Sequence, residues 1–137
     1  MKFFFDNNLS LHLAHAIREL SKSLPEVESV VHLRDRFKPN ERDLVWAPEL
    51  VKDGPWSIIS MDHFTRNHNA EREALRRAGH TVFVLDRQWS KHLFWAQGQQ
   101  LIGWWPKIVE QSTLVSGGAF SVPWRQSAKR KFLAMKL

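Results

Sequence analysis

The sequence contains no cysteine in its 137 residues. This absence excludes disulfides, thiolate zinc sites and cysteine nucleophiles, and it favours a protein of the reducing cytoplasm. Long apolar runs are also lacking: no stretch of about 18 apolar residues occurs, and the first apolar run, residues 3–5, is too short for a signal peptide. We therefore expect a soluble protein without a membrane partner. Glycine-rich phosphate-binding motifs, G-x-S-x-G and H-E-x-x-H are absent too.

Acidic residues are scarce in the C-terminal part of the chain. Residues 87–137 contain 8 basic side chains and one acid, Glu110, whereas residues 1–86 contain 12 basic and 13 acidic side chains. The net charges of the two parts are therefore +7 and −1, which sum to the +6 of the whole chain. Such asymmetry favours a polyanionic partner, either nucleic acid or an acidic protein segment, and the alternative is a solvated basic tail.

Short apolar runs alternate with segments of helical periodicity. We predict four strands and a short fifth strand at residues 3–5, 30–33, 56–59, 82–85 and 119–122. Helices are predicted at residues 10–24, from about 40, from about 67 to 78, and at about 90–111 with a break at Gly103 or Pro106. This order indicates a three-layer α/β fold, with a mostly parallel sheet of four to five strands and helices on both faces. We take residues 1–124 as the domain and 125–137 as a basic tail.

Four aspartates follow the first four predicted strands directly or nearly directly: Asp6, Asp35, Asp62 and Asp86. Parallel strands end at one edge of the sheet, and ligands bind outside that edge in open α/β sheets. Acids gathered there repel one another unless they are protonated or bind a cation. In the strand order 2-1-3-4, the first and third strands are neighbours about 5 Å apart. Asp6 and Asp62 would then face each other.

For a divalent metal site we select Asp6, Asp62 and Asp43, the last expected on the first turn of the second helix. Mg²⁺ or Mn²⁺ takes oxygen ligands and retains several waters, so two or three carboxylates suffice beside a phosphate. An ion held in this way polarises a phosphoryl oxygen and activates water, as in many nucleases. Each aspartate alone is also explained as a turn or cap residue, and we prefer that explanation for Asp35 and Asp86.

Several short motifs stand in a fixed order: FFDNNLS at 4–10, VHLRD at 31–35, Asp43, IISMDHF at 58–64 and EREAL at 71–75. Together they resemble the compact PIN-like domains grouped with VapC-type toxins, over about residues 2–89. The resemblance implies a PIN-like fold, a Mg²⁺- or Mn²⁺-dependent ribonuclease, and a toxin held inactive by a cognate antitoxin. The family's acids of the first strand, second helix and third strand correspond to Asp6, Asp43 and Asp62.

Two positions depart from the pattern of this family. Many relatives have an acid where Asn7 stands, and often a proline where Leu11 stands. Because an amide lowers the negative charge of the site, we expect weaker metal binding. The usual fourth acid corresponds to Asp86 or Asp35, and we keep Asp86 and Asn8 as candidates for the wider metal shell.

Basic and aromatic side chains suggest how RNA would bind. Candidates for contacts with its backbone are Arg34, Arg36, Arg66, Arg72 and Arg76. The like-charge pair at positions 72 and 76, one helical turn apart, makes sense beside a phosphate. For any single arginine, an ordinary surface role is the simpler alternative.

Five of the seven tryptophans lie in the basic part, at positions 89, 95, 104, 105 and 124. Aromatic rings beside cations stack unpaired bases, and they also anchor protein interfaces. The simpler alternative is a core role for at least half of them, including Trp95 and one of Trp104 or Trp105. Adjacent helical residues point about 100° apart, so we do not expect both Trp104 and Trp105 to be fully buried. The seven histidines are taken as surface or polar-core residues.

The leading hypothesis is a single-domain endoribonuclease that is the toxin of a bacterial toxin–antitoxin pair. Its substrate would be RNA. Its protein partners would be an antitoxin and, in a homodimer, a second copy of the chain. A receiver-like signalling domain, with Asp62 as the phosphoryl acceptor, is a second hypothesis. It matches only in part, because Asn7 replaces a paired acid and no lysine ends the fifth strand. A third is a nucleic-acid-binding module without catalysis, whose acids are caps.

Overall fold

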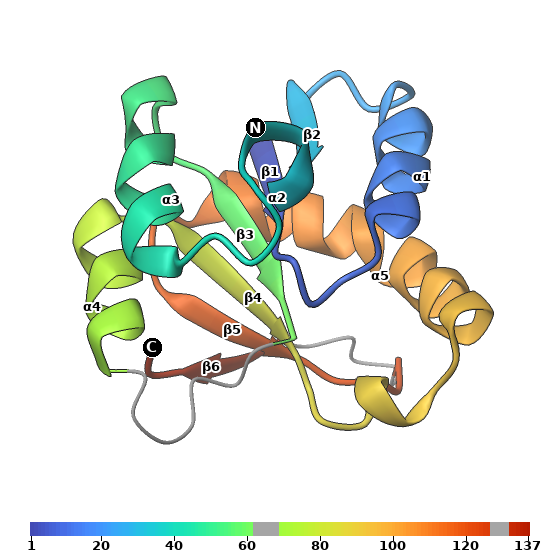
Figure 1. The fold of residues 1–137 in the computed structure, drawn as a ribbon. Coiled ribbons are helices and arrows are strands. Elements are labelled where there is room, and N and C mark those ends of the chain that lie inside the picture. Colours follow the sequence, from blue (N-terminus) through green and yellow to red (C-terminus); the bar gives the residue numbers. More distant parts are fainter. Residues whose placement is uncertain (62–68, 127–131) are drawn as a thin grey trace.

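The computed structural model of the chain describes residues 1–61, 69–126 and 132–137, which form a central sheet with helices on both faces (Figure 1). The strand order is β2-β1-β3-β4-β5-β6, and the bounds are β1 (Lys2–Phe5), β2 (Ser29–His32), β3 (Ser57–Ser60), β4 (Thr81–Leu85), β5 (Ala119–Val122) and β6 (Leu133–Met135). β1 to β5 are parallel, and β6 is antiparallel to β5. The predicted α/β class and mostly parallel sheet are confirmed.

The order 2-1-3-4 of the first four strands is also as predicted, and β5 lies at the predicted residues. The sequence does not predict β6, which lies in the segment expected to be a tail. β6 has only three residues, LAM, and its side chains are exposed or half-buried. The apolar run to which it belongs, residues 132–135, is short and lies between lysines of the basic segment. The division of the chain at residue 124 stays a prediction.

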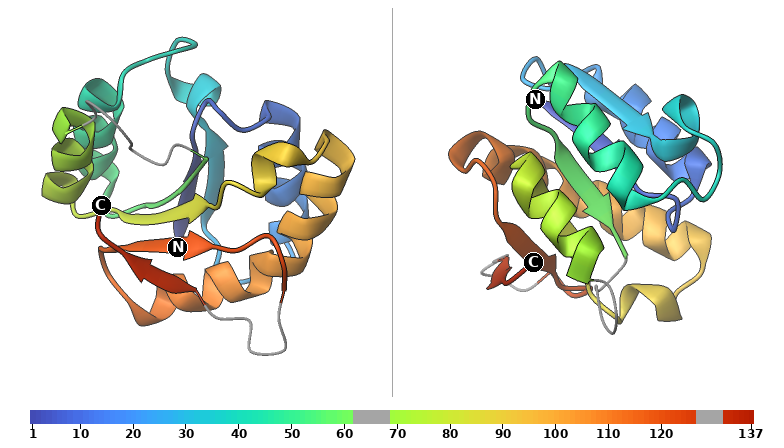
Figure 2. Two further views of the ribbon diagram at one scale, coloured as in Figure 1. Left: turned by 90° about the horizontal axis from the view of Figure 1, so that it is seen from below. Right: turned by 60° about the vertical axis from the view of Figure 1, so that its left-hand side comes forward.

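Helices cover the sheet in two pairs, α1 with α5 on one face and α3 with α4 on the other (Figures 1 and 2). The helices are α1 (Leu11–Ser21), α2 (Leu33–Arg36), α3 (Asp43–Leu50), α4 (Asn69–Ala78) and α5 (Phe94–Leu114), with the short 3-10 helices η1 (Val51–Asp53) and η2 (Trp89–Lys91). Within the described residues, none of these helices is long and apolar enough to span a membrane.

The three phenylalanines of β1 show how the strand serves both faces. Successive side chains of a strand point to opposite faces, and all three rings are fully buried. Phe3 and Phe5 pack toward α1 and α5, where the ring centroid of Trp105 lies 4.8 Å from that of Phe3. Phe4 packs toward α3 and stacks on Trp46 at 4.6 Å. By the same alternation, Asp6, which follows Phe5, points to the face that α3 and α4 cover.

The helix α5 is continuous through Gly103 and Pro106, so the predicted break is wrong. Both residues lie on the exposed side of the helix. Proline removes one helical hydrogen bond, but buried side chains on both sides of it, including Leu101 and Ile108, hold the two halves against the sheet. The packing of α5 against the sheet therefore outweighs the free-energy cost of the helical hydrogen bond that Pro106 removes.

The burial expected for the tryptophans is wrong in two respects. Trp95 is 85% exposed, whereas Trp104 and Trp105 are both buried, at 1% and 3%. Trp105 packs on Phe3 of the sheet, and Trp104 lies 5.2 Å from Phe132, between centroids. The adjacent rings point apart as expected, but the C-terminal segment covers the side of α5 that a bare helix would expose to solvent.

Candidate active site

Asp6 lies at the carboxyl end of β1, where its side chain is only 8% exposed. Its backbone N–H donates to the carbonyl of Ile59 at 3.0 Å, which continues the pairing with β3. One carboxylate oxygen accepts a hydrogen bond from the Asn7 N–H at 2.6 Å, and the other accepts one from the Ser60 hydroxyl at 3.0 Å. The carboxylate is therefore held in one orientation, between β1 and β3.

The strand register places this carboxylate on the face that α3 and α4 cover. Phe5 pairs with Ile59, so Asp6 comes level with Ser60. Ile58, two residues before Ser60, belongs to the core beneath α3 and α4, and side chains two apart in a strand share a face. Asp6 and Ser60 thus meet at the edge beside these two helices.

The loop before α3 is tied to the same edge. The side-chain amide of Asn7 donates to the side-chain oxygen of Asn40 at 3.0 Å. Asn40 has a φ of 64°, a left-handed conformation that asparagine tolerates better than most residues. Three residues later α3 begins with Asp43 in its first turn, where the helix dipole favours an acid. The contact brings the start of α3 toward the edge that carries Asp6.

Asn8 links the loop after β1 to the end of β3. Its side-chain oxygen accepts a hydrogen bond from the Met61 N–H at 3.1 Å. Met61 directly precedes Asp62, and Asp62 and Arg66 lie outside the described residues. The predicted pairing of Asp6 with Asp62 stays a prediction, as does the place of Asn8 in the metal shell.

The atoms at this edge that could bind a metal ion are oxygens, which belong to the Asp6 carboxylate, the Ser60 hydroxyl and the asparagine side-chain amides. This donor set fits a hard cation such as Mg²⁺ or Mn²⁺ in kind. Within residues 1–61, 69–126 and 132–137, no group of three histidine, cysteine or acidic side chains is close enough to hold an ion. A complete set of three carboxylates would require Asp62.

Asp35 acts as a cap, as the sequence indicates. Its carboxylate accepts a hydrogen bond from the His32 N–H at 2.7 Å, within a capping box that opens α2. Arg18 and His15 of α1 pair with it at 2.6 and 2.9 Å. Burial alone would raise the pKa of Asp35, but the His32 hydrogen bond, His15 and Arg18 outweigh it and lower the pKa below its usual value.

Asp86 also has the hydrogen bonds of a turn residue. Its two carboxylate oxygens accept from the N–H groups of Gln88 at 2.9 Å and Trp124 at 3.3 Å. The register sets Val84 level with Ser60, so Asp86 lies two strands from Asp6 and two residues further along. It therefore lies at the margin of the site, and a role in the metal shell stays a prediction.

Among the candidate arginines whose side chains the structure describes, Arg36 and Arg76 are engaged with carboxylates. Arg36 pairs with Asp53 at 2.6 Å and lies over the ring of Trp56, at 5.6 Å from its centroid. Arg76 pairs with Glu73 at 2.9 Å. Arg34 is exposed. The side chains of residues 66 and 72 lie outside the description, so RNA contacts by all five arginines stay a prediction.

His32 is a supporting residue that the sequence does not single out. It is fully buried, its Nε2–H donates to the Leu9 carbonyl at 2.7 Å, and its Nδ1 accepts from the Arg34 N–H at 3.0 Å. Burial lowers the pKa of His32, which keeps the ring neutral as this arrangement requires. The ring ties the loop after Asp6 to α2. A histidine within an otherwise apolar strand is the signal that would have pointed to it.

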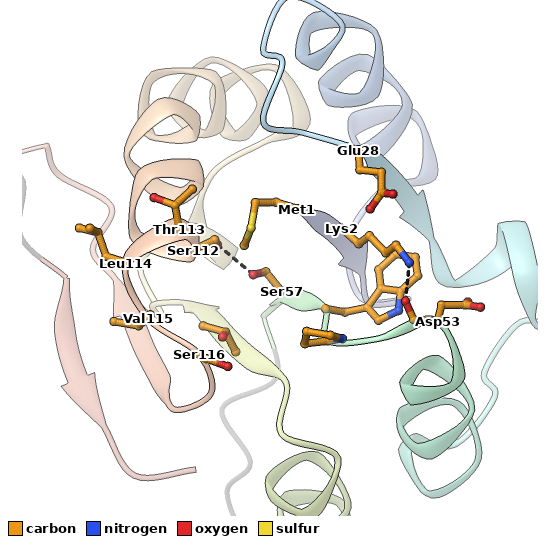
Figure 3. Close-up of a pocket in the computed structure, with 13 residues that line it drawn as sticks. Met1, Lys2, Glu28, Asp53, Ser57, Ser112, Thr113, Leu114, Val115 and Ser116 are labelled. Carbon is orange, nitrogen blue, oxygen red and sulfur yellow. Dashed lines mark hydrogen bonds between the residues drawn. The ribbon is translucent and has the colours of Figure 1, made fainter.

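A cavity of about 510 Å³ opens at the opposite edge of the sheet (Figure 3). It is lined by residues at the starts of strands, among them Lys2, Ser57 and Thr81. Figure 3 shows Ser57 and Ser112 pointing toward each other, and the Ser57 hydroxyl donates to that of Ser112 at 2.9 Å. The cavity is therefore separate from the edge that carries the acids.

A family model described as a PIN like domain matches residues 1–87. This range includes β1 to β4 and the three acids at positions 6, 43 and 62. Comparisons with curated proteins and with solved structures found no match.

Proposed function

The chain belongs to the PIN-like domain family, and we propose that it is a metal-dependent endoribonuclease that acts as the toxin of a type II toxin–antitoxin pair. PIN-like domains are in general nucleases that use divalent metal ions. The observation that carries the proposal is the buried carboxylate of Asp6, which Ser60 and the Asn7 N–H orient at the carboxyl edge of the sheet. A carboxylate buried at this edge needs such donors or a cation to offset its lost hydration.

In this proposal Asp6, Asp43 and Asp62 hold Mg²⁺ or Mn²⁺. The ion would polarise a phosphoryl oxygen of the RNA backbone and lower the pKa of a bound water that attacks it. Ser60 orients Asp6, and Asn8 positions the backbone just before Asp62. The orientation of the ligands matters because mutation of a residue that hydrogen-bonds to a metal ligand commonly lowers metal affinity or activity by roughly 10- to 100-fold.

The charge distribution supports RNA as the substrate. The net charge of +7 on residues 87–137 would attract a phosphate backbone. The same surface would attract acidic residues of an antitoxin, so inhibition by occupation of the RNA surface is consistent with the proposal.

Digestion of total cellular RNA tests this function. We expect purified protein to cleave RNA with Mn²⁺ or Mg²⁺ and not with EDTA, and the Asp62→Asn variant to be inactive and non-toxic when expressed in bacteria. Cleavage that persists in EDTA, or in Asp62→Asn, would overturn the metal mechanism.

A receiver-like function remains as a second candidate because β1 to β5 are parallel in the order 2-1-3-4-5, which doubly wound receivers share. Asn7 stands where a receiver has its second acid, and Pro123 follows β5 where a lysine would be expected. Incubation with a small phosphodonor separates the two functions. Stable labelling at Asp62 would support the receiver, and its absence together with RNA cleavage would support the nuclease.

A further inference from the structure

Three consecutive apolar side chains stand out from the surface at the start of α5. Leu93 is 86% exposed, Phe94 41% and Trp95 85%. The Phe94 and Trp95 rings contact each other edge to face, with centroids 5.6 Å apart. The buried face of α5 begins only at Leu101, so the core does not require these three side chains. Adjoining exposed apolar side chains of this size commonly mark a binding surface.

This cluster, residues 93–95, lies at the same edge of the sheet as Asp6. β1 and β4 are parallel to β3 and end at one edge, and α5 begins nine residues after β4 ends. α1 begins five residues after Asp6. A Cβ on Gly98 of α5 would lie 3.5 Å from Leu13 of α1, so the N-terminal parts of the two helices pack side by side (Figures 1 and 2).

The segment just before this cluster is fixed in place. The His92 ring stacks on Trp124, with centroids 3.7 Å apart and planes 6° apart, and Trp124 contacts Trp89 edge to face at 4.9 Å. The Gln97 amide donates to the carbonyls of Trp89 and His92 at 2.8 and 2.9 Å. An exposed ring on such a rigid base loses little conformational freedom when it binds a planar ligand.

The charge around the cluster is positive. Residues 87–106 contain Arg87 and Lys91 and no acid. The neighbouring acid, Asp86, has both carboxylate oxygens occupied by backbone N–H groups. Exposed rings flanked by cations match a single-stranded nucleic acid, whose bases stack while its phosphates pair with the cations.

We propose that Trp95, backed by Phe94, is a stacking platform for an unpaired base of the RNA that the Asp6 edge cleaves. The proposal rests on the ribonuclease function. Loss of one stacked base weakens binding about 5- to 150-fold. A stacked base would direct single-stranded RNA across the carboxyl edge of the sheet, toward the acids.

The test is the affinity of the full-length protein for a short single-stranded RNA in EDTA, where cleavage does not occur, read from quenching of tryptophan emission and from anisotropy of a labelled RNA. We expect Trp95→Leu to weaken binding about 5- to 150-fold and to lose most of the quenching. Trp95→Phe, which keeps a ring, should retain binding within about threefold of the unaltered protein if stacking carries the affinity. Leu114→Ala, at the exposed other end of α5, is the matched control and should bind normally.

Equal RNA affinity of Trp95→Leu and the unaltered protein would overturn the proposal and leave a protein segment as the occupant of the surface. Loss of affinity in Trp95→Phe as great as in Trp95→Leu would also overturn it, because stacking requires only a ring. The same RNA incubated with Mn²⁺ tests the nuclease separately. Ring-dependent binding without cleavage would support the platform and refute the ribonuclease.

Discussion

Replacing Ser60 by alanine should impair the chemistry of the candidate site far more than it impairs the fold. The Ser60 hydroxyl is fully buried and donates to Asp6 at 3.0 Å. A hydrogen bond to a charged group contributes about 1.5–3 kcal/mol, against a stability of about 5–15 kcal/mol for a typical domain. The variant therefore remains folded, but its Asp6 carboxylate loses the hydrogen bond that Ser60 donates and that helps to fix its orientation. For a hydrogen-bond partner of a metal ligand, we expect activity to fall about 10- to 100-fold.

The same strand offers a matched control. Ser57 is also a buried serine of β3, and its hydroxyl donates to Ser112 at 2.9 Å at the opposite edge of the sheet. Ser57→Ala loses a neutral hydrogen bond, which contributes about 0.5–1.5 kcal/mol, and leaves the acid edge intact. The assay is Mn²⁺-dependent cleavage of an end-labelled RNA, with urea unfolding of both variants. Equal activity losses in Ser57→Ala and Ser60→Ala, in proportion to stability, would refute a positioning role for Ser60.

Two further predictions concern pH and the amide at position 7. Burial lowers the pKa values of His32 and His80 below the usual 6.5. The unfolded chain therefore binds more protons than the folded protein at mildly acidic pH, and the free energy of unfolding should fall as the pH drops below about 6.5. Urea unfolding at pH 7.5 and 5.5 tests this prediction. Equal urea midpoints at the two pH values would contradict it. Asn7→Asp adds a carboxylate beside Asp6 and should tighten Mn²⁺ binding in calorimetry; unchanged or weaker binding would show that residue 7 does not face the ion.

The sequence predicts the strand order and the two-faced core because both follow from local patterns. Each of β1 to β4 is an apolar run bounded by polar residues, and the helical segments between them fix the parallel direction. β6 also belongs to a short apolar run, residues 132–135, but no helical segment separates it from β5, and its antiparallel pairing depends on where the chain returns after β5. The burial of Trp104 depends on the same return, because Phe132 covers it.

The sequence likewise predicts only part of the candidate site. The role of Asp6 as a site residue is predicted because Asp6 directly follows an apolar strand. Ser60 and His32 do not, because the partners that give them their roles, Asp6 and Leu9, lie 54 and 23 residues away in the sequence. The contact of Asn7 with Asn40 likewise joins two loops that no periodicity relates. Residue type and spacing thus indicate the acids, whereas the network that orients them requires the three-dimensional fold.

The rate of Mn²⁺-dependent RNA cleavage by Asp6→Asn, compared with that of the unaltered protein, tests the central claim most directly. The amide keeps the size of the side chain but removes its charge, and loss of a metal ligand should exceed the roughly 100-fold upper range for loss of an outer hydrogen-bond partner. We predict that cleavage falls by more than about 100-fold while the urea midpoint shows a folded protein. Cleavage by folded Asp6→Asn at the rate of the unaltered protein would contradict the assignment of this edge as the active site.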